Sequence, residues 1–224
     1  SVWQSIFYKE KNILIIATKL AVAQNFIRKV KTYIKSMPNW LLVPTVIANN
    51  KQQVEFSNGS QIKAVPTSED AGRSEALSLL IVDEAAFVRN FDELWMGLYP
   101  TLSTGGRAII LSTPNGVGGQ YHEIYTKAER KENEFNEIKL MWDVHPERGD
   151  EWFEKETKNM SKKQVSQELL CDFASSGDTF LSNDILENIR VRTKSPIEKS
   201  GPNNNIWYWE YPIEGKNYIL SADI

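Results

Sequence analysis

Short apolar runs alternate with segments of helical periodicity along most of the chain. Residues 12–17, NILIIA, form a β-branched apolar run between polar residues, which is typical of a strand buried on both faces of a parallel sheet. Residues 77–82 and 108–111 repeat this pattern. Residues 20–37 carry apolar side chains at alternating steps of three and four, which predicts an amphipathic helix that ends before Pro38.

The same alternation continues through the middle of the chain. Apolar spacing predicts helices over 91–102, 121–131, 151–158 and 162–171, and a further strand over 136–141. Strands that alternate with helices indicate βαβ units, so we expect an α/β fold with a mostly parallel sheet.

Residues 53–65 predict a β-hairpin, and the length of its loop decides the register. A two-residue Asn-Gly loop would place Val54 opposite Lys63 and spoil the apolar face. A three-residue loop that ends at a left-handed Gly59 places Val54 opposite Ile62 instead. We therefore favour the three-residue loop.

Charge and composition exclude several classes of protein. The 224 residues include 26 Lys and Arg against 29 Asp and Glu, so the chain is not a globally basic nucleic-acid coat protein. One cysteine, Cys171, excludes an intrachain disulfide and a Cys-rich zinc site, and two histidines are too few for a His metal cluster. No apolar stretch of about 18 residues occurs, so we expect no membrane association.

The predicted helix over 20–37 still holds a local concentration of positive charge. Arg28, Lys31 and Lys35 lie on its polar face, and residues 18–36 contain no acidic residue. A solvated helix face is one interpretation. A DNA-facing patch is the other.

The composition changes after Phe173. Residues 174–214 are rich in Ser, Gly, Pro and Asn, which indicates a connector with some local structure. Residues 218–223 then begin a new apolar strand close to the end of the chain. Since one strand does not make a domain, and since the chain starts at Ser1, we expect a fragment of a larger intracellular-type protein.

The strongest chemical signal is the segment 79–84, LLIVDE. A buried strand delivers two acids at its carboxyl end, where ligands bind in open α/β sheets. This is the Walker B pattern of P-loop ATPases, in which Asp83 would hold Mg²⁺ and Glu84 would polarise the attacking water. A structural strand that happens to end in Asp-Glu is the alternative.

Two further segments add to this signal. The run 109–116 ends an apolar strand in Ser112, Thr113 and Asn115, whose hydroxyl and amide groups can bind a γ-phosphate or the attacking water; an Asx or Ser/Thr turn is the alternative. Arg73 lies eleven residues before Glu84 and could act as an arginine finger, or it could be an ordinary surface arginine.

Together these segments resemble the large terminase subunit of tailed bacteriophages, most of all the terminases of large myovirus-type phages. The resemblance covers nearly the whole chain. It is carried by Arg73, 83–87 (DEAAF), 112–116 (STPNG), 121–125 (YHEIY), Trp142, 145–146, 167–168, 171–173 and 218–223.

The resemblance implies a P-loop NTPase domain of the RecA-like, additional-strand catalytic-glutamate class, followed by a nuclease of RNase H-like fold. The corresponding division is an ATPase domain at 1–173, a connector at 174–214 and the start of the nuclease at 215–224. By position, Glu84 and Arg73 match catalytic residues, Asp83 matches the Mg²⁺ ligand, and Asp223 matches the first nuclease metal ligand. Ser112 and Thr113 match the motif that couples ATP hydrolysis to DNA movement, and Asn115 beside them is a further expected nucleotide-binding residue.

One departure from the family matters for activity. No G-x-x-x-x-G-K-[ST] loop occurs in the 224 residues, and only one carboxylate of the nuclease cluster is present. We therefore expect this fragment neither to hydrolyse ATP efficiently nor to cut DNA.

For the intact protein, the resemblance implies a motor that uses ATP and Mg²⁺ to package double-stranded DNA into a procapsid, with an endonuclease that uses Mg²⁺ or Mn²⁺. The implied partners are DNA, the portal protein, the small terminase subunit and further copies in a ring. The implied location is the host bacterial cytoplasm, with transient attachment to the procapsid. The alternatives are another P-loop nucleic-acid motor, such as a helicase, and a non-catalytic DNA-binding or capsid scaffold protein.

Overall fold

The computed structural model describes residues 1–41, 44–67, 76–177 and 183–217. The chain falls into two compact units, Ser1–Asp178 and Thr179–Ile224, and each is described by itself. The functional division into ATPase domain, connector and nuclease stays a prediction.

A mostly parallel sheet forms the centre of the first unit. In the described ranges, six strands join it in the order β2-β3-β4-β1-β5-β6. Strand β1 pairs in parallel with β4 and β5, and β5 pairs in parallel with β6, whereas β2–β3 and β3–β4 are antiparallel. The strands are β1 (Asn12–Ala17), β2 (Val46–Asn49), β3 (Gln53–Phe56), β4 (Gln61–Pro66), β5 (Leu79–Val82) and β6 (Arg107–Ile110).

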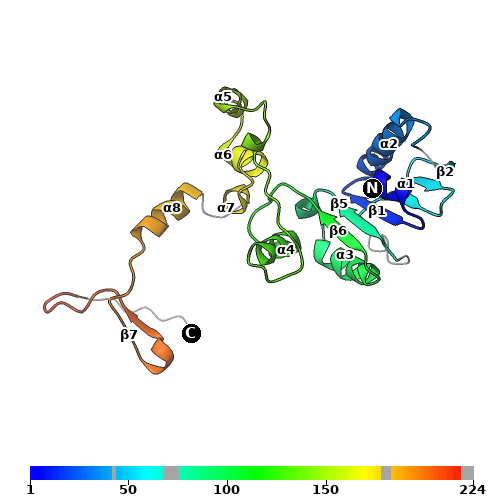
Figure 1. Cartoon of the computed structure of the whole chain (residues 1–224). Coiled ribbons are helices and arrows are strands. Elements are labelled where there is room, and N and C mark those ends of the chain that lie inside the picture. Colours follow the sequence, from blue (N-terminus) through cyan, green and yellow to red (C-terminus); the bar gives the residue numbers. More distant parts are fainter. Residues whose placement is uncertain (42–43, 68–75, 178–182, 218–224) are drawn as a thin grey trace. The chain divides into compact units, whose positions relative to one another are not determined.

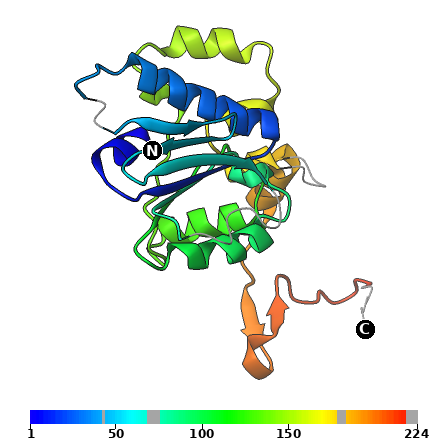
Figure 2. The ribbon, with the colours of Figure 1, turned by 90° about the vertical axis from the view of Figure 1, so that its right-hand side faces the viewer.

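Helices cover both faces of this sheet. Ile13 and Ile15 of β1 pack in one apolar cluster with α2 (Leu20–Ser36). Leu14 of β1 points to the opposite face and joins a second cluster, with α3 (Phe91–Leu98) and α4 (Gly119–Glu129). Figure 2 shows α2 on one side of the sheet and α3 and α4 on the other. The three-layer arrangement confirms the α/β fold and the burial of β1 on both faces.

The hairpin between β3 and β4 has the predicted register. Val54 lies opposite Ile62, and Gly59 has a φ angle of 81°, in the left-handed region that favours glycine. A three-residue loop is therefore correct, because it keeps Val54, Phe56 and Ile62 on the buried face.

The predicted helices are present, with changes at their ends (Figure 1). The segment 91–102 is α3 followed by a 3₁₀ turn, Tyr99–Leu102. The segment 162–171 is α6 (Lys162–Gln164), which continues as a π turn, Val165–Leu169. The remaining helices of the first unit are α1 (Val2–Phe7), α5 (Asp150–Thr157) and α7 (Phe173–Ser176), with short 3₁₀ turns at Ala85–Phe87 and Trp142–Val144.

The predicted strand over 136–141 is wrong. The segment is irregular, and Ile138 leaves 75% of its surface exposed. Its alternation of polar and apolar residues has the period of a strand, but a strand also needs a neighbouring backbone to hydrogen-bond. No strand in the described part of the chain pairs with residues 136–141.

In the second unit, the first described element is helix α8 (Asn183–Arg192). A small antiparallel hairpin follows, formed by β7 (Glu198–Ser200) and β8 (Ile206–Tyr208) around a 3₁₀ turn, Pro202–Asn204. The strand predicted over 218–223 lies outside the described residues. Among the helices that the structure describes, none has the length and apolar character needed to cross a bilayer.

Phe56 is fully buried between the sheet and α2, so its replacement tests this packing. We expect Phe56→Ala to lower the free energy of unfolding by about 3–5 kcal/mol, because transfer and cavity terms add. Urea denaturation followed by circular dichroism measures the change. Ile47→Ala is the control, since Ile47 is 64% exposed on β2 and should cost no more than about 0.5 kcal/mol. Equal losses in the two variants would contradict the assigned core.

Candidate active site at the carboxyl ends of the central strands

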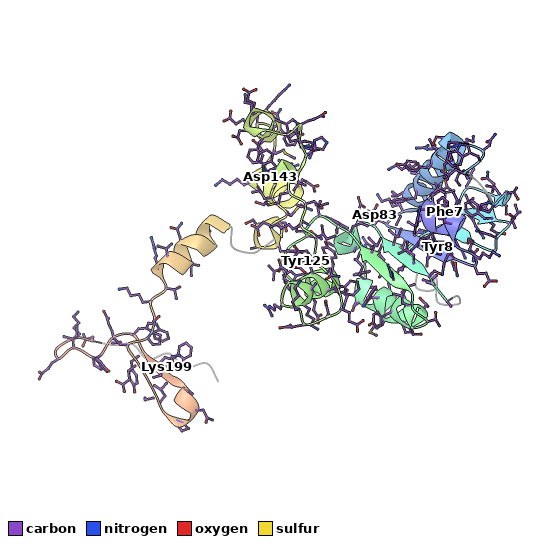
Figure 3. All side chains as sticks on the ribbon, in the orientation of Figure 1. Phe7, Tyr8, Asp83, Tyr125, Asp143 and Lys199 are labelled. Carbon is purple, nitrogen blue, oxygen red and sulfur yellow. The ribbon has the colours of Figure 1, made fainter. Side chains whose placement is uncertain are left out.

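Asp83 and Glu84 follow β5 at the carboxyl edge of the sheet, where Figure 3 labels Asp83. The Asp83 N–H donates to the carbonyl of Ile16 at 2.9 Å, so the β1–β5 ladder reaches the acidic pair. Glu84 then adopts a left-handed backbone, with φ 52° and ψ 41°, and a 3₁₀ turn begins at Ala85. This conformation is unfavourable for a residue with a side chain, and such strain clusters at functional sites.

The Glu84 side chain has a partner that sequence reasoning missed. The Thr18 hydroxyl donates to the Glu84 carboxylate at 3.2 Å. Thr18 directly follows β1, and the parallel pairing of β1 with β5 brings the two strand ends together. The sequence signal that could have indicated this role is a hydroxyl residue, Thr18, directly after a buried strand.

The end of β6 lies beside the turn that follows the acidic pair. The Ala85 N–H donates to the Leu111 carbonyl at 3.1 Å. The Ser112 hydroxyl accepts from the Ala86 N–H at 3.1 Å, and the Asn115 side-chain amide donates to the Ala86 carbonyl at 3.2 Å. Two segments predicted separately from the sequence therefore form one site. Since Ser112 acts here as an acceptor, its hydroxyl proton can point toward a ligand.

Thr113 is half-buried in the same loop, next to Ser112. The described structure gives its side chain no polar partner, so its assignment to the site stays a prediction. Arg73 and Asp223 lie outside the described residues, and their assignments also stay predictions.

The loop after β6 is held in place from a distant part of the chain. The Tyr121 hydroxyl donates to the Ser112 carbonyl at 3.2 Å, and the Gly116 N–H donates to the buried Ser176 hydroxyl at 2.9 Å. A methyl group on Gly177 would lie 2.7 Å from the Gly116 Cα, so only glycine permits this approach. The position of the loop therefore depends on α7 as well as on β6.

A pocket of about 480 Å³ adjoins the 3₁₀ turn and this loop. Its lining includes the polar residues Asn90, Asp92, Asn115 and Glu123 and the aromatic residue Phe173. The pocket borders the candidate site through Asn115, but neither Asp83 nor Glu84 lines it.

The electrostatics of the acidic pair suit a cation. Burial raises the pKa of the Asp83 carboxyl above its ordinary value, and the neighbouring charge of Glu84 raises it further. A hydrogen bond from the backbone of Glu84 and the charge of Lys29 oppose this shift in the pKa. Within the described ranges, no group of three Asp, Glu, His or Cys side chains converges on one point. One carboxylate together with substrate phosphates is nevertheless a common way to hold Mg²⁺.

The raised pKa of Asp83 predicts how stability responds to pH. Because the folded state binds this proton more tightly than the unfolded state, ionisation of Asp83 opposes folding as the pH rises through the folded-state pKa. We expect Asp83→Asn to be more stable than the parent protein at pH 7, with a difference that shrinks toward about pH 4, the region of an unfolded Asp.

Urea unfolding at several pH values measures this difference. Asp143→Asn is the matched control, because Asp143 is exposed. The prediction is wrong if Asp83→Asn is less stable than the parent at pH 7 and its loss of stability exceeds that of Asp143→Asn. Desolvation would then not be the cause that raises the pKa of Asp83.

Comparison with known proteins places this chain in a family. Residues 1–188 match the family model described as terminase large subunit, T4likevirus-type, N-terminal. The fold is similar to that of the large terminase ATPase domain of Thermus phage P74-26, with a TM-score of 0.61 and 21% identity over 77% of this chain and 80% of that one.

Other large terminases share this fold. One from a thermophilic bacteriophage, solved with ADP, has a TM-score of 0.60 and 13% identity over 77% of this chain and 42% of that chain. The same terminase was also solved with ATP-gamma-S. The HK97 bacteriophage large terminase has a TM-score of 0.53 and 13% identity, over 84% of this chain and 44% of that chain.

The chain thus spans less than half of the length of these two terminase chains. At these identities the structures show a shared fold, whereas the family model covers most of the chain. Because this family model covers more than half of the chain, the chain belongs to the terminase large subunit family of the T4-like virus type, and its first 188 residues match the N-terminal part.

Proposed function

We propose that this chain is the core of a viral DNA-packaging ATPase, in which ATP hydrolysis drives double-stranded DNA into a procapsid. The observation that carries the proposal is the convergence of Glu84 and Ser112 at one edge of the sheet, through the 3₁₀ turn that begins at Ala85. Two neighbouring strands of a parallel sheet therefore end in groups that suit phosphate and water. A related large terminase is known with ADP and ATP-gamma-S, which supports a nucleotide as the ligand.

The residues of the site have distinct proposed roles. Asp83 would hold Mg²⁺ together with the nucleotide phosphates, and the cation would neutralise the charge that these phosphates carry. Glu84 orients and polarises the attacking water, and the Thr18 hydroxyl holds the Glu84 carboxylate in position. Ser112, Thr113 and Asn115 contact the terminal phosphate or the water.

The remaining part of the nucleotide site is a phosphate-binding loop. The 224 residues contain no G-x-x-x-x-G-K-[ST] segment. In the described sheet, β6 is an edge strand, and Ile109 is 50% and Leu111 42% exposed there. We propose that the strand carrying the loop pairs with β6, because a buried parallel strand is expected at such an apolar edge. Efficient hydrolysis then requires more of the protein than these residues.

Arg73 is proposed as an arginine finger, which stabilises the charge on the transferred phosphoryl group of a neighbouring subunit. Asp223 is proposed as the first metal ligand of an RNase H-like endonuclease that cuts the packaged DNA. The proposed partners are double-stranded DNA, the portal protein, the small terminase subunit and further copies of the same chain in a ring. The proposed location is the host cytoplasm, with attachment to the procapsid during packaging.

Replacement of Glu84 tests the proposed chemistry directly. In the complete large subunit, we expect Glu84→Gln to lower kcat for ATP hydrolysis by about 10²–10⁴-fold and to retain ATP binding, because an amide still accepts hydrogen bonds but does not polarise water as a carboxylate does. Thr18→Val should lower kcat by roughly fivefold, the worth of one positioning hydrogen bond of about 1 kcal/mol.

Glu93→Gln is the control, since Glu93 is an exposed acid in the first turn of α3. Phosphate release and nucleotide binding, measured side by side, separate the turnover defect from a binding defect. If Glu84→Gln keeps more than half of the parent activity, the assignment of the catalytic carboxylate is wrong.

A mixing experiment tests the role of Arg73 between subunits. Arg73→Ala and Glu84→Gln should each be inactive alone. Mixed in an assembled ring, they should recover part of the activity, because a subunit with an intact Glu84 then receives Arg73 from its neighbour. ATP hydrolysis is measured across mixing ratios, and a lack of recovery at every ratio would favour action within one subunit.

A further inference from the structure

Positive charge is segregated into the first third of the chain. Residues 1–67 carry nine lysines and arginines against two glutamates, whereas residues 68–224 carry 17 against 27 acidic residues. The 44 residues between Glu10 and Glu55 contain no acid at all. Such asymmetry between parts of one chain points to a polyanionic partner for the basic part.

The structure gathers part of this charge on one flank of α2. Arg28, Lys31 and Lys35 follow one another at steps of three and four, and the opposite side of the helix packs on the sheet. Lys31 donates to the Asn50 carbonyl at 2.7 Å, which ties this flank to the turn between β2 and β3, where Lys51 is exposed. We call Arg28, Lys31, Lys35 and Lys51 the basic ridge.

The basic ridge carries positive charge that no described acidic side chain pairs with. In the part of the chain that the structure describes, no carboxylate forms an ion pair with any of its four members. Like charges at these helical spacings repel one another, and α2 contains no acid to offset them. A surface shaped only for solubility mixes both signs of charge, so the ridge favours a bound anion over a merely solvated face.

We propose that the basic ridge binds the phosphate backbone of double-stranded DNA, an inference that rests on the proposed packaging function. From Arg28 to Lys35 the ridge rises about 10 Å at 1.5 Å per residue, which corresponds to about three successive phosphates of one DNA strand. No apolar side chain belongs to the ridge, so insertion into a lipid surface is disfavoured. Contacts to phosphates alone carry no sequence information, as a motor that moves along any sequence requires.

Fluorescence anisotropy with a labelled 30-base-pair duplex tests the proposal on the 224-residue chain, without nucleotide, between 50 and 200 mM NaCl. The logarithm of the binding constant K falls linearly with the logarithm of the salt concentration, and each lost phosphate contact makes this slope less steep by about 0.9. We therefore expect Arg28→Gln/Lys35→Gln to reduce the slope by about 1.8 and to weaken binding at 50 mM NaCl by roughly tenfold or more. Gln24→Lys extends the same flank by one turn and should steepen the slope by about 0.9.

The matched control is Lys155→Gln/Lys158→Gln, which removes the same charge from exposed positions at the end of α5. It should leave the slope unchanged. Equal losses in both double variants, an unchanged slope in the ridge variant, or no duplex binding by the parent chain at 50 mM NaCl would overturn the proposal.

Two further readouts keep the outcome unambiguous. Thermal melts check that each variant is folded, and Gln24→Lys tests the ridge by gain of binding if a loss variant unfolds. Poly-glutamate competition distinguishes DNA from an acidic protein: a ridge variant that loses poly-glutamate binding but keeps duplex affinity contradicts the proposal. Because no step here uses nucleotide, a failure to bind DNA leaves the ATPase assignment to be decided by the Glu84 variant.

Discussion

The parallel pairing of β1 with β5 is the constraint on which the rest of the structure depends. Strand β1 is buried on both faces, so its alternate side chains hold α2 on one side and α3 on the other. The same pairing aligns the carboxyl ends of the two strands. Thr18 and the acidic pair therefore lie close together because the pairing of β1 with β5 places their carboxyl ends side by side. The positions of these side chains are fixed by the most buried part of the sheet.

The site concentrates features that cost stability. Glu84 has a left-handed backbone without being glycine, and Asp83 is a partly buried carboxylate next to another acid. Neither feature improves packing, and both would be removed by simple substitutions. Their presence at the end of a rigid strand suits the proposed cation, which would compensate the negative charge of the two carboxylates on binding.

The loop after β6 joins this chemistry to the far end of the first unit. Its glycine, Gly116, is held by Ser176, sixty residues later, and the two glycines Gly116 and Gly177 approach more closely than any side chain would allow. A change in the position of Ser112 is therefore expected to shift the backbone of α7, because tightly packed backbones move together. The loop that carries the proposed coupling motif is therefore in direct contact with α7 and Gly177.

The sequence by itself determined the elements whose signals are local. Buried strands, the stripe of α2 and the hairpin register at Gly59 all follow from periodicity and turn chemistry, and Asp83 and Ser112 were identified as strand-end residues. Tertiary structure alone decided that Thr18 holds Glu84, that Ser176 clamps the loop after β6, and that residues 136–141 are not a strand. These three features depend on which backbones lie side by side. A strand needs a neighbouring strand, and a hydrogen bond between residues sixty positions apart needs a distant partner, and no local sequence pattern encodes the position of either.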